Sequence, residues 1–373
     1  MALDVGELTE RLGRSSTSSK SNARVEPIVH HHGTMTSIVP FREVCKAIKE
    51  VAFENNNLPL IISLEVGAEK EQQEMMVEIM QEEWGDLLLQ EPIEGCDPTE
   101  RQPRLDELLN KILIKVKPLE TPTPTPTSET VVVERVERGR SGIVSSIRQK
   151  PPICEALAKL AVYTQSKHFD DQQFTTVRTP SHIFSVSEDN FCKLALDSKK
   201  LNKLLVHNRN FFMRIYPKGL RVDSSNPDPA LPWRRGVQMV AMNWQKTDQA
   251  MMCNDAMFSD TKGWVLKPPG FLSDDPGDFH EIPRKNVGLR ITVLAGQNLP
   301  LPEDKQLKNG GDVKPKFRPQ VKVELHVERL NKSQEYEAET KPKDGENPDW
   351  GHHGSTLEFL GVNDIIQELS FVR

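Results

Sequence analysis

Hydrophobic and polar positions follow two alternating periods along residues 25–117. Apolar residues recur at helical spacing in FREVCKAIKEVA (residues 41–52) and EKEQQEMMVEIMQEEW (residues 69–84), and Gly85 is placed to end the second helix. Short apolar runs before, between and after them predict strands: PIVHH (27–31), LPLIISLE (58–65) and KILIKVK (111–117). Alternating strands and helices indicate an α/β fold with a parallel sheet and helical crossovers.

The rest of the chain divides into three further regions. Residues 119–168 contain ETPTPTPTSE, whose alternating prolines favour an extended segment, so this region is expected to be a linker. Patterned sequence returns in residues 169–283. In residues 284–373, LRITVLAGQNL and PQVKVELHV alternate with period two, as half-buried antiparallel strands do. We therefore expect a separate β-sandwich at the end of the chain.

Composition narrows the class of protein. The formal net charge is -6, and no long run of Lys and Arg provides the basic face that nucleic-acid binding needs. The five cysteines show no CxxC spacing, which indicates a reducing, intracellular setting. No apolar run approaches the roughly 20 residues of a membrane-spanning helix. Residues 1–24 are polar, lack the apolar core of a secretory signal, and are expected to be a disordered tail.

Candidate chemistry gathers where the predicted strands end. The carboxyl ends of strands carry the reactive residues of α/β folds, and the residues at these ends are His31, Glu65, Lys115 and Lys117. Three consecutive histidines offer two readings. Histidines two positions apart on a strand share a face and could hold a metal together, but no HExxH motif or Cys/His pair supplies further ligands. A single functional histidine is the favoured reading.

The other candidates each admit a functional and an ordinary interpretation. Glu65 is either a ligand for a hard cation such as calcium or a strand-end carboxylate. Lys115 and Lys117 share a strand face, so they either flank a phosphate or form a solvated edge. Arg214 and Tyr216, in FFMRIYP, suit a phosphorylated ring-shaped ligand, although such a pair is common on exposed strands.

Taken together, these segments resemble the eukaryotic phosphoinositide-specific phospholipase C family. The X-box resemblance lies in EPIVHHHGTMTS, FREVCKAI, LPLIISLE and KILIKVK. The Y-box resemblance lies in FSVSE, RIYP followed by DSSN, MNWQ and GWVLKP, which occur in the family's order, and LRITVLAGQNLP resembles the start of a C2 domain. The resemblance covers nearly everything from Val25 onward.

The resemblance implies an architecture and a reaction. It implies a TIM-type (β/α) barrel split by a linker and followed by an all-β C2-type sandwich. The matching segments are 25–118 for the second part of the X box, 119–168 for the linker, 169–283 for the Y box and 284–373 for a partial C2 domain. It implies calcium-dependent hydrolysis of phosphatidylinositol 4,5-bisphosphate to diacylglycerol and inositol trisphosphate, by a cytoplasmic protein bound peripherally at the inner membrane surface.

Family roles follow at matching positions. His31 takes the position of the histidine that protonates the leaving diacylglycerol oxygen, and His32 is the alternative because only His32 precedes a glycine directly. Glu65 matches a calcium ligand. Phosphate and inositol contacts are implied for Lys115, Lys117, Ser187, Arg214 and Tyr216.

The chain also departs from the family pattern. A first catalytic histidine and further acidic calcium ligands are expected upstream of EPIV, where we find only the polar residues 1–24. We therefore expect an N-terminally truncated, incomplete barrel with impaired activity. The alternative function is a non-catalytic phosphoinositide-binding or scaffold protein. Such a protein keeps Lys115, Lys117, Ser187, Arg214 and Tyr216 but needs no upstream histidine.

Overall fold

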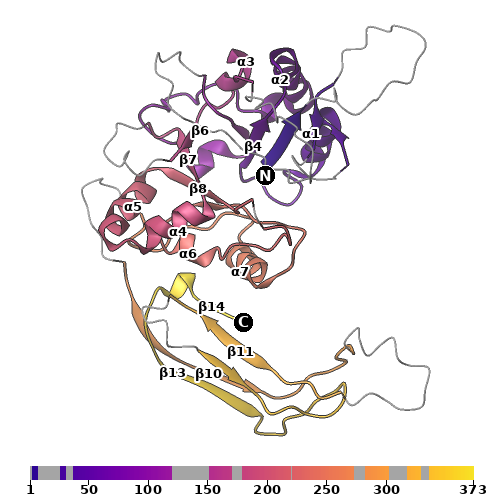
Figure 1. Ribbon diagram of the computed structural model, residues 1–373, viewed down its shortest axis with the longest axis vertical. Helices are drawn as coiled ribbons and strands as arrows, with labels where there is room; N and C mark the ends of the chain where they lie inside the picture. Colours follow the sequence, from indigo (N-terminus) through magenta and orange to yellow (C-terminus); the bar gives the residue numbers. More distant parts are fainter. Residues whose placement is uncertain are drawn as a thin grey trace, which may run out of the picture. The chain divides into compact units, whose positions relative to one another are not determined.

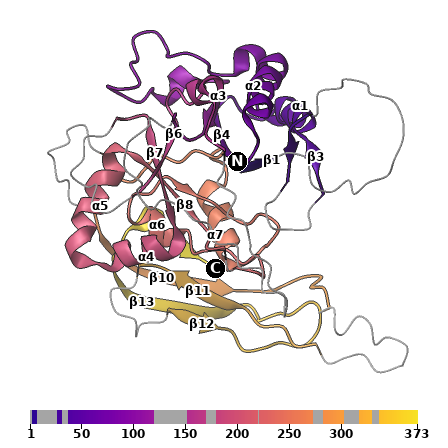
Figure 2. The same ribbon diagram turned by 45° about the horizontal axis from the view of Figure 1, so that its top comes forward.

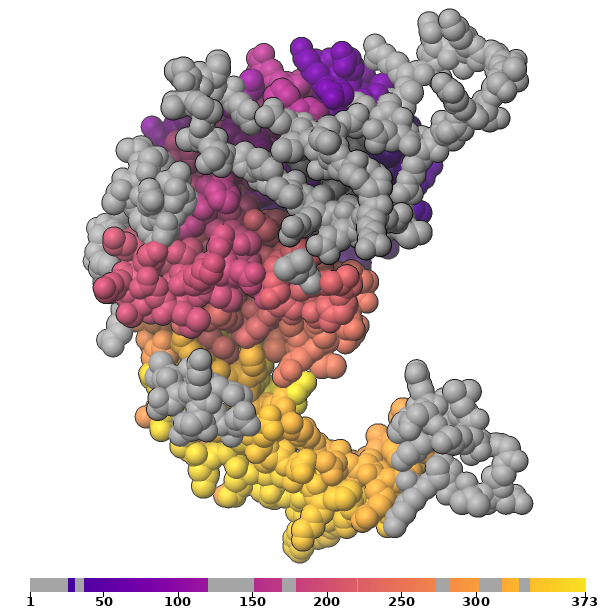
Figure 3. Space-filling model, in the orientation of Figure 1, coloured from indigo at the N-terminus to yellow at the C-terminus, as the bar shows by residue number. Residues whose placement is uncertain are grey.

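The computed structural model of the chain divides into two compact units. The first comprises Met1–Ser187, Asn210–Arg214 and Asp260–Trp264; the second comprises Glu188–Arg209, Ile215–Ser259 and Val265–Arg373. The structure describes the following residues, with the backbone alone for the first range: 2–6, 26–30, 37–119, 151–169, 179–219, 221–272, 282–301, 317–328 and 336–373. Residues outside these ranges are grey in Figure 3.

A sheet that combines parallel and antiparallel pairs organises the first unit (Figure 1). Its strand order is β3-β2-β1-β4-β5, with β1, β4 and β5 parallel and with β2 and β3 antiparallel to their neighbours. The strand bounds are Ala2–Gly6 for β1, Ile28–Val29 for β2, Val39–Pro40 for β3, Leu60–Val66 for β4 and Ile112–Lys115 for β5. The α/β class predicted from the pattern is confirmed.

Helices α1 (Phe41–Val51), α2 (Lys70–Trp84) and α3 (Glu155–Lys159) share one apolar core with this sheet. Ile62 and Leu64 of β4 contribute to that core, as do the even-numbered apolar residues of β5. The odd-numbered residues of both strands lie on the opposite face of the sheet, because successive side chains of a strand alternate. Both long helices begin and end within a residue or two of the predicted bounds, and Gly85 ends α2 with a backbone φ of 50°.

The first sheet continues into a second one through a single parallel bridge between Val116 and Gln165. The second sheet has the order β6-β7-β8-β9, and its first two strands are parallel. The strand bounds are Gln165–His168 for β6, His182–Ser187 for β7, Phe212–Tyr216 for β8 and Met239–Val240 for β9. Strands with adjacent numbers thus lie side by side from β4 through β9.

Two sequence-based expectations are wrong in part. Residues 2–6 of the expected tail form strand β1, which lies between β2 and β4 in the sheet. Residues 151–168 of the expected linker form α3 and β6, and Leu157 and Leu160 are buried in the first core. Periodicity alone did not show where packing against the domain resumes after the proline-rich segment. Residues 120–150, which contain those prolines, lie outside the described ranges.

A buried glutamine holds the end of the expected linker on helix α2. The side chain of Gln73 is fully buried. Its amide nitrogen donates to the carbonyl oxygens of Ala68 (2.8 Å) and Pro152 (3.0 Å), and its amide oxygen accepts from the backbone N–H of Cys154 (2.7 Å). A buried polar group must be paired in this way to offset its desolvation. Gln73 therefore sets the position at which α3 begins.

The second unit contains helices α4 (Glu188–Leu196), α5 (Ser198–Asn210), α6 (Ala230–Trp233) and α7 (Gln249–Phe258). Helices α4 and α5 are separated at Asp197, whose side chain accepts from the backbone N–H of Lys199 (2.9 Å). An Asp that bonds the backbone two residues ahead starts a new helix rather than continuing one.

Residues 284–373 form two antiparallel sheets, as period-two alternation predicted (Figure 2). One pairs β10 (Lys285–Val293) with β13 (Ser355–Ile365), and the other has the order β12-β11-β14. The bounds of the second set are Lys322–His326 for β11, Glu337–Glu339 for β12 and Phe371–Val372 for β14. Apolar side chains from both sheets share one core, which includes Val323, Leu325, Leu357 and Phe359. Short 3-10 turns at Gly85–Leu87, Leu105–Leu108 and Gln367–Leu369 complete the regular structure.

Within the second unit, arginines join the strands of residues 284–373 to the segment around α6. Buried Arg234 donates to the backbone carbonyl oxygens of Leu369 (2.7 Å) and His326 (2.9 Å). Arg235 forms an ion pair with Glu328 (2.6 Å) whose two side chains are mostly buried. These bonds hold the β-rich segment on the helical one by charge-assisted contacts.

We expect Gln73→Ala to lower the free energy of unfolding by about 2–4 kcal/mol, because the change leaves the buried Cys154 N–H without its acceptor. Chemical denaturation followed by circular dichroism measures this. Gln81→Ala is the matched control on the same helix, since Gln81 is exposed and bonds only to another exposed side chain. Equal effects of the two changes would contradict this role for Gln73.

Candidate functional site

Lys115 lies at the end of β5 on the face turned away from the helices. Leu113, two residues earlier, packs in a separate core with Tyr163 rather than in the core shared with the helices. Ser63 on β4 is the register partner of Lys115, and Glu65 follows Ser63 by two positions on the same strand. Two-residue periodicity thus places Ser63, Glu65 and Lys115 on one face of the sheet. We refer to this side of the sheet as the candidate face.

The ammonium of Lys115 is buried, with the residue only 4% exposed. It donates to the hydroxyl oxygen of Ser166 on β6 at 2.8 Å, and the Ser63 hydroxyl oxygen lies 3.5 Å away. Burial and the nearby positive charge of Arg214 lower the pKa of Lys115 to about 7, against an opposing effect of Glu65. Within the described residues, no carboxylate forms an ion pair with Lys115. A lysine and an arginine that repel each other form a place for an anion.

The structure places the remaining predicted residues unequally. Lys117 and Glu65 are exposed, whereas Ser187, Arg214 and Tyr216 are half-buried at the ends of β7 and β8. Arg214 and Glu65 both act electrostatically on the pKa of Lys115, in opposite directions. His31 and His32 lie outside the described residues, and their assignment as the proton donor remains a prediction. His30, which precedes them, is half-buried after β2.

An ion pair that the sequence pattern did not predict connects the segment after Ser187 with the segment after Tyr216. Glu188, the residue after Ser187, accepts from the Arg221 Nε at 2.8 Å and from a second guanidinium nitrogen of the same arginine. It also accepts a longer bond from the backbone N–H of Lys218 (3.3 Å), in the loop after β8. The Arg221 hydrogen bond lowers the pKa of Glu188. The spacing of the β7 and β8 ends is therefore set by a charge-assisted fork.

The DSSN and MNWQ motifs hold two loops together and have a structural role. Asn226 of DSSN is buried, and its side-chain amide donates to the carbonyl oxygens of Asn243 (3.2 Å) and Lys246 (3.0 Å), in and just after MNWQ. Its side-chain oxygen accepts from the Asn243 N–H (2.5 Å). Asp248 accepts from the backbone N–H of Asn226 (2.8 Å) and caps α7. DSSN and MNWQ thus join the loops that follow β8 and β9.

GWVLKP has a comparable structural role. The Trp264 indole N–H donates to the carbonyl oxygen of Pro59 just before β4 (3.1 Å). Lys267 donates to the carbonyl oxygen of Asn208 in the last turn of α5 (2.5 Å), where a cation also complements the helix dipole. Burial lowers the pKa of Lys267 to about 7, with a further contribution from Arg209. These residues help to define the family without taking part in the candidate site.

A second acidic position, also missed by the sequence reading, comes from β1. The Cα register pairs Asp4 with Glu65 across the parallel β1 and β4 strands. In the sequence, β1 corresponds to ALDVG, a short apolar run with one acidic residue. It lies within residues 1–24, whose polar composition predicts a disordered tail. Within the ranges the structure describes, no group of three or more His, Cys, Asp or Glu side chains is arranged to hold a metal.

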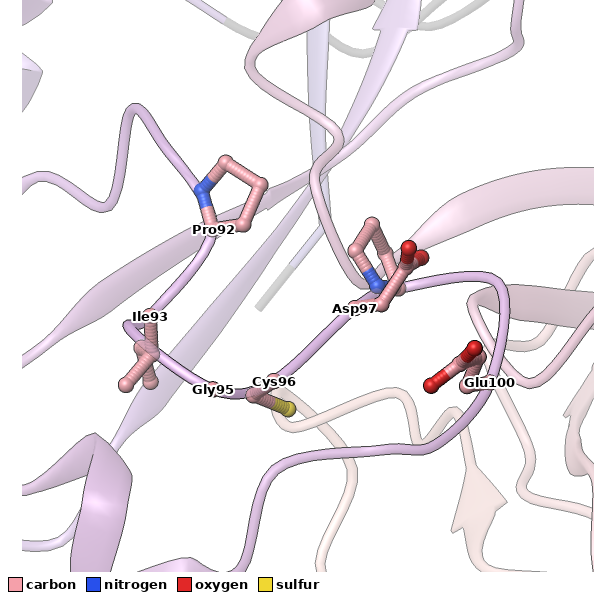
Figure 4. A pocket seen from close by; sticks show the side chains of 7 residues that line it. Pro92, Ile93, Gly95, Cys96, Asp97 and Glu100 are labelled. Carbon is pink, nitrogen blue, oxygen red and sulfur yellow. The ribbon is translucent and has the colours of Figure 1, made fainter.

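A hollow of about 380 Å³ opens on the loop that contains Pro92, Gly95 and Cys96 (Figure 4). Figure 4 shows that the carboxylates of Asp97 and Glu100 belong to the same loop. None of the predicted site residues lines this hollow. Two carboxylates disfavour a phosphorylated ligand, so the hollow is distinct from the candidate site in both its position and its charge.

Comparison with protein families gives two matches. The Y domain of phosphatidylinositol-specific phospholipase C matches residues 157–270, and the X domain of the same family matches residues 16–118. Together they span more than half of the chain. The Y-domain match begins inside α3, which agrees with the packing of residues 151–168 into the first core.

Curated relatives and solved structures agree with these matches. The chain is 34% identical to 1-phosphatidylinositol 4,5-bisphosphate phosphodiesterase delta-3-A of Danio rerio, over 87% of this chain and 42% of that protein. It is 34% identical to the delta-1 enzyme of Homo sapiens, over 81% of this chain and 41% of that protein. The crystal structure of PLC21 from S. officinalis shares the fold, with a TM-score of 0.72, 24% identity and coverage of 100% of this chain and 44% of that one.

The fold defines an α/β protein whose candidate face carries a buried lysine. The chain belongs to the phosphoinositide-specific phospholipase C family, a family of phosphodiesterases. It spans less than half the length of the curated relatives just compared. None of the helices in the described ranges has the length and apolar character needed to cross a bilayer.

The low pKa of Lys115 makes stability depend on pH. Between about pH 7 and the ordinary lysine value of 10.5, the unfolded chain binds a proton that the folded chain lacks, so stability rises with pH across this window. We expect Lys115→Met to be more stable than the wild type by about 2–4 kcal/mol at pH 6.5, with the difference shrinking toward pH 10. Urea unfolding at several pH values measures it.

Lys117→Met is the matched control for this measurement, because Lys117 is exposed on the same segment. Its free energy of unfolding relative to the wild type should not change over the same pH range. A pH-independent difference for Lys115→Met would contradict the lowered pKa.

We expect Arg221→Gln to lower the free energy of unfolding by about 1–3 kcal/mol, because it leaves the half-buried Glu188 carboxylate without its fork. Arg290→Gln provides the comparison, since the Arg290–Glu358 pair is exposed and should contribute less than about 1 kcal/mol. Thermal or chemical unfolding measures both. If the two changes cost the same, the Glu188–Arg221 fork does not set the spacing of the two strand ends.

Proposed function

We propose that the chain contributes to the hydrolysis of phosphatidylinositol 4,5-bisphosphate to diacylglycerol and inositol trisphosphate. The observation that carries the proposal is the buried ammonium of Lys115, which has hydroxyl partners rather than a carboxylate and lies near Arg214. This arrangement suits a multiply charged phosphate. The names of these relatives agree with this substrate.

The described residues are assigned to binding and orientation. Lys115 and Arg214 attract phosphate oxygens, and the planar guanidinium of Arg214 can donate two parallel hydrogen bonds to them. Tyr216 follows two positions later on β8 and offers a ring face and a hydroxyl to the inositol. Ser187 offers a hydroxyl at the end of β7, and Lys117 adds an exposed positive charge where the ligand enters. These roles rest on the family resemblance and on the strand ends that carry the residues.

The proton donor is assigned to His31, with His32 as the alternative. In the proposed reaction the inositol 2-hydroxyl attacks the phosphorus, and the bond to the diacylglycerol oxygen breaks. The histidine gives its proton to that oxygen, and water then opens the cyclic phosphate. An imidazole suits this task because its ordinary pKa is near 6.5, within reach of neutral pH.

Calcium is the cofactor that the family resemblance implies. Glu65 is an exposed carboxylate on the candidate face, and Asp4 is its register partner on β1. Calcium takes about six to eight oxygen ligands, and the described side chains provide no group of that kind. Because the described residues alone do not fit the ion, we assign it no step in the reaction.

We also propose the finer architecture and the location. Strands β1 and β4 to β9 correspond to an incomplete (β/α) barrel, supported by their neighbour-to-neighbour order and by the bridge between Val116 and Gln165. The two sheets of residues 284–373 correspond to a partial C2-type sandwich, supported by their shared core. A lipid substrate places the protein at a membrane surface, and the family resemblance suggests the cytoplasmic face.

The experiment is release of inositol trisphosphate from vesicles that contain phosphatidylinositol 4,5-bisphosphate, with and without a calcium chelator. We expect His31→Ala to reduce the rate by about 10²- to 10⁴-fold, the usual contribution of a general acid. His32→Ala is the matched change one residue away and should retain most of the rate. A rate that neither change lowers would overturn the assignment of the proton donor.

The second candidate function is phosphoinositide binding without turnover, as in a scaffold protein. It is favoured by the absence of a metal-binding group among the described side chains. Calcium-independent binding to the same vesicles, with no inositol trisphosphate released, would support it over the hydrolase.

A further inference from the structure

Ser166 occupies a position that the family resemblance did not assign. It lies on β6, within the segment that the sequence reading treated as linker. Its hydroxyl oxygen accepts a hydrogen bond from the Lys115 ammonium at 2.8 Å, the shorter of the two polar contacts that the ammonium makes. The bond crosses from β5 to β6, where the two sheets meet at the bridge between Val116 and Gln165.

The backbone of Ser166 is fixed on both sides. Its N–H donates to the carbonyl oxygen of Val116 (2.8 Å), and Ile183 on β7 is its register partner. Because its backbone is held on both sides, Ser166 has little freedom to follow a movement of the Lys115 side chain. The lysine side chain, by contrast, has a flexible four-carbon stem. The rigid member of the pair is therefore Ser166, and it determines where the Lys115 nitrogen lies.

The chemical type of the partner matters as much as its position. A carboxylate here would neutralise Lys115 and compete with any phosphate, whereas a serine hydroxyl is neutral. An ammonium has three N–H groups. Ser166 takes one and Ser63, at 3.5 Å, receives at most a weak second bond, which leaves donor capacity for an anion.

We propose that Ser166 is a positioning residue that orients the Lys115 ammonium toward a phosphate group of the bound inositol phosphate while preserving its charge. This proposal rests on the proposed function for the identity of the ligand. Ser166 itself need not touch the ligand, so its effect should pass entirely through Lys115. That requirement distinguishes it from a serine that only supports the strand.

The test is a double-mutant cycle on the full 373-residue chain, with binding of soluble inositol 1,4,5-trisphosphate measured by titration calorimetry. We expect Ser166→Ala to weaken binding by about 5- to 20-fold, in line with one hydrogen bond that involves a charged group. In the Lys115→Met background the same change should alter binding by less than about 2-fold. Ser166→Thr, which keeps the hydroxyl, should restore most of the affinity.

Ser185→Ala is the matched control. Ser185 lies on the neighbouring strand β7, and its buried hydroxyl oxygen has no hydrogen-bond partner among the described residues. Its loss should change affinity by less than about 2-fold. Ser166→Cys, which keeps the side-chain volume and accepts hydrogen bonds weakly, should resemble Ser166→Ala and shows that the loss does not come from a cavity.

The outcomes separate this proposal from the proposed function. Equal losses from Ser166→Ala with and without Lys115 would show a structural role and overturn the proposal, as would no loss in the presence of Lys115. Neither result would change the outcome expected in the hydrolysis assay. Binding with the expected cycle but no hydrolysis would overturn the proposed reaction and leave the role of Ser166 intact. No binding by the wild-type chain would overturn both.

Discussion

The candidate site depends on the burial of one ammonium group between parallel strands. Placing a positive charge in a sheet is costly unless its N–H groups are bonded. The two neighbouring strands supply hydroxyls instead of carboxylates, so the charge of Lys115 is solvated but not neutralised. A lowered pKa follows from the same burial, with Arg214 adding to it. An anionic ligand beside Lys115 would favour its protonated form and so offset this lowering of the pKa.

Polar contacts between distant segments hold this arrangement in place. Gln73 fixes the segment that leads into α3. Glu188 and Arg221 connect the ends of β7 and β8, and Asn226 connects the loops beyond β8 and β9. Each contact satisfies groups that would otherwise be unpaired in a partly buried setting. Asn226 of DSSN therefore supports the site rather than forming it.

The residues that identify the family are mostly different from those that form the candidate site. RIYP, DSSN, MNWQ and GWVLKP identify the family, yet only Arg214 and Tyr216 among them are candidates for ligand contact. Asp4 and Ser166 were not predicted, because both lie in regions that were assigned by composition, the polar residues 1–24 and the linker 119–168. Composition averages over a window, and a five-residue strand such as β1 is short enough to be lost in that average.

Local pattern was sufficient for the helices α1 and α2 and for the strands β4, β5 and β8, because burial of an apolar face follows directly from periodicity. The two-residue alternation of a strand also places Lys115 and Ile114 on opposite faces of the sheet. The sequence alone thus determined the class of fold, the strand ends and most of the candidate residues. Only the tertiary structure decided which hydroxyl meets Lys115, that β1 lies beside Glu65, and that residues 151–168 pack within the domain. These are contacts between segments tens of residues apart, and such pairings depend on strand register and packing, which no local window contains.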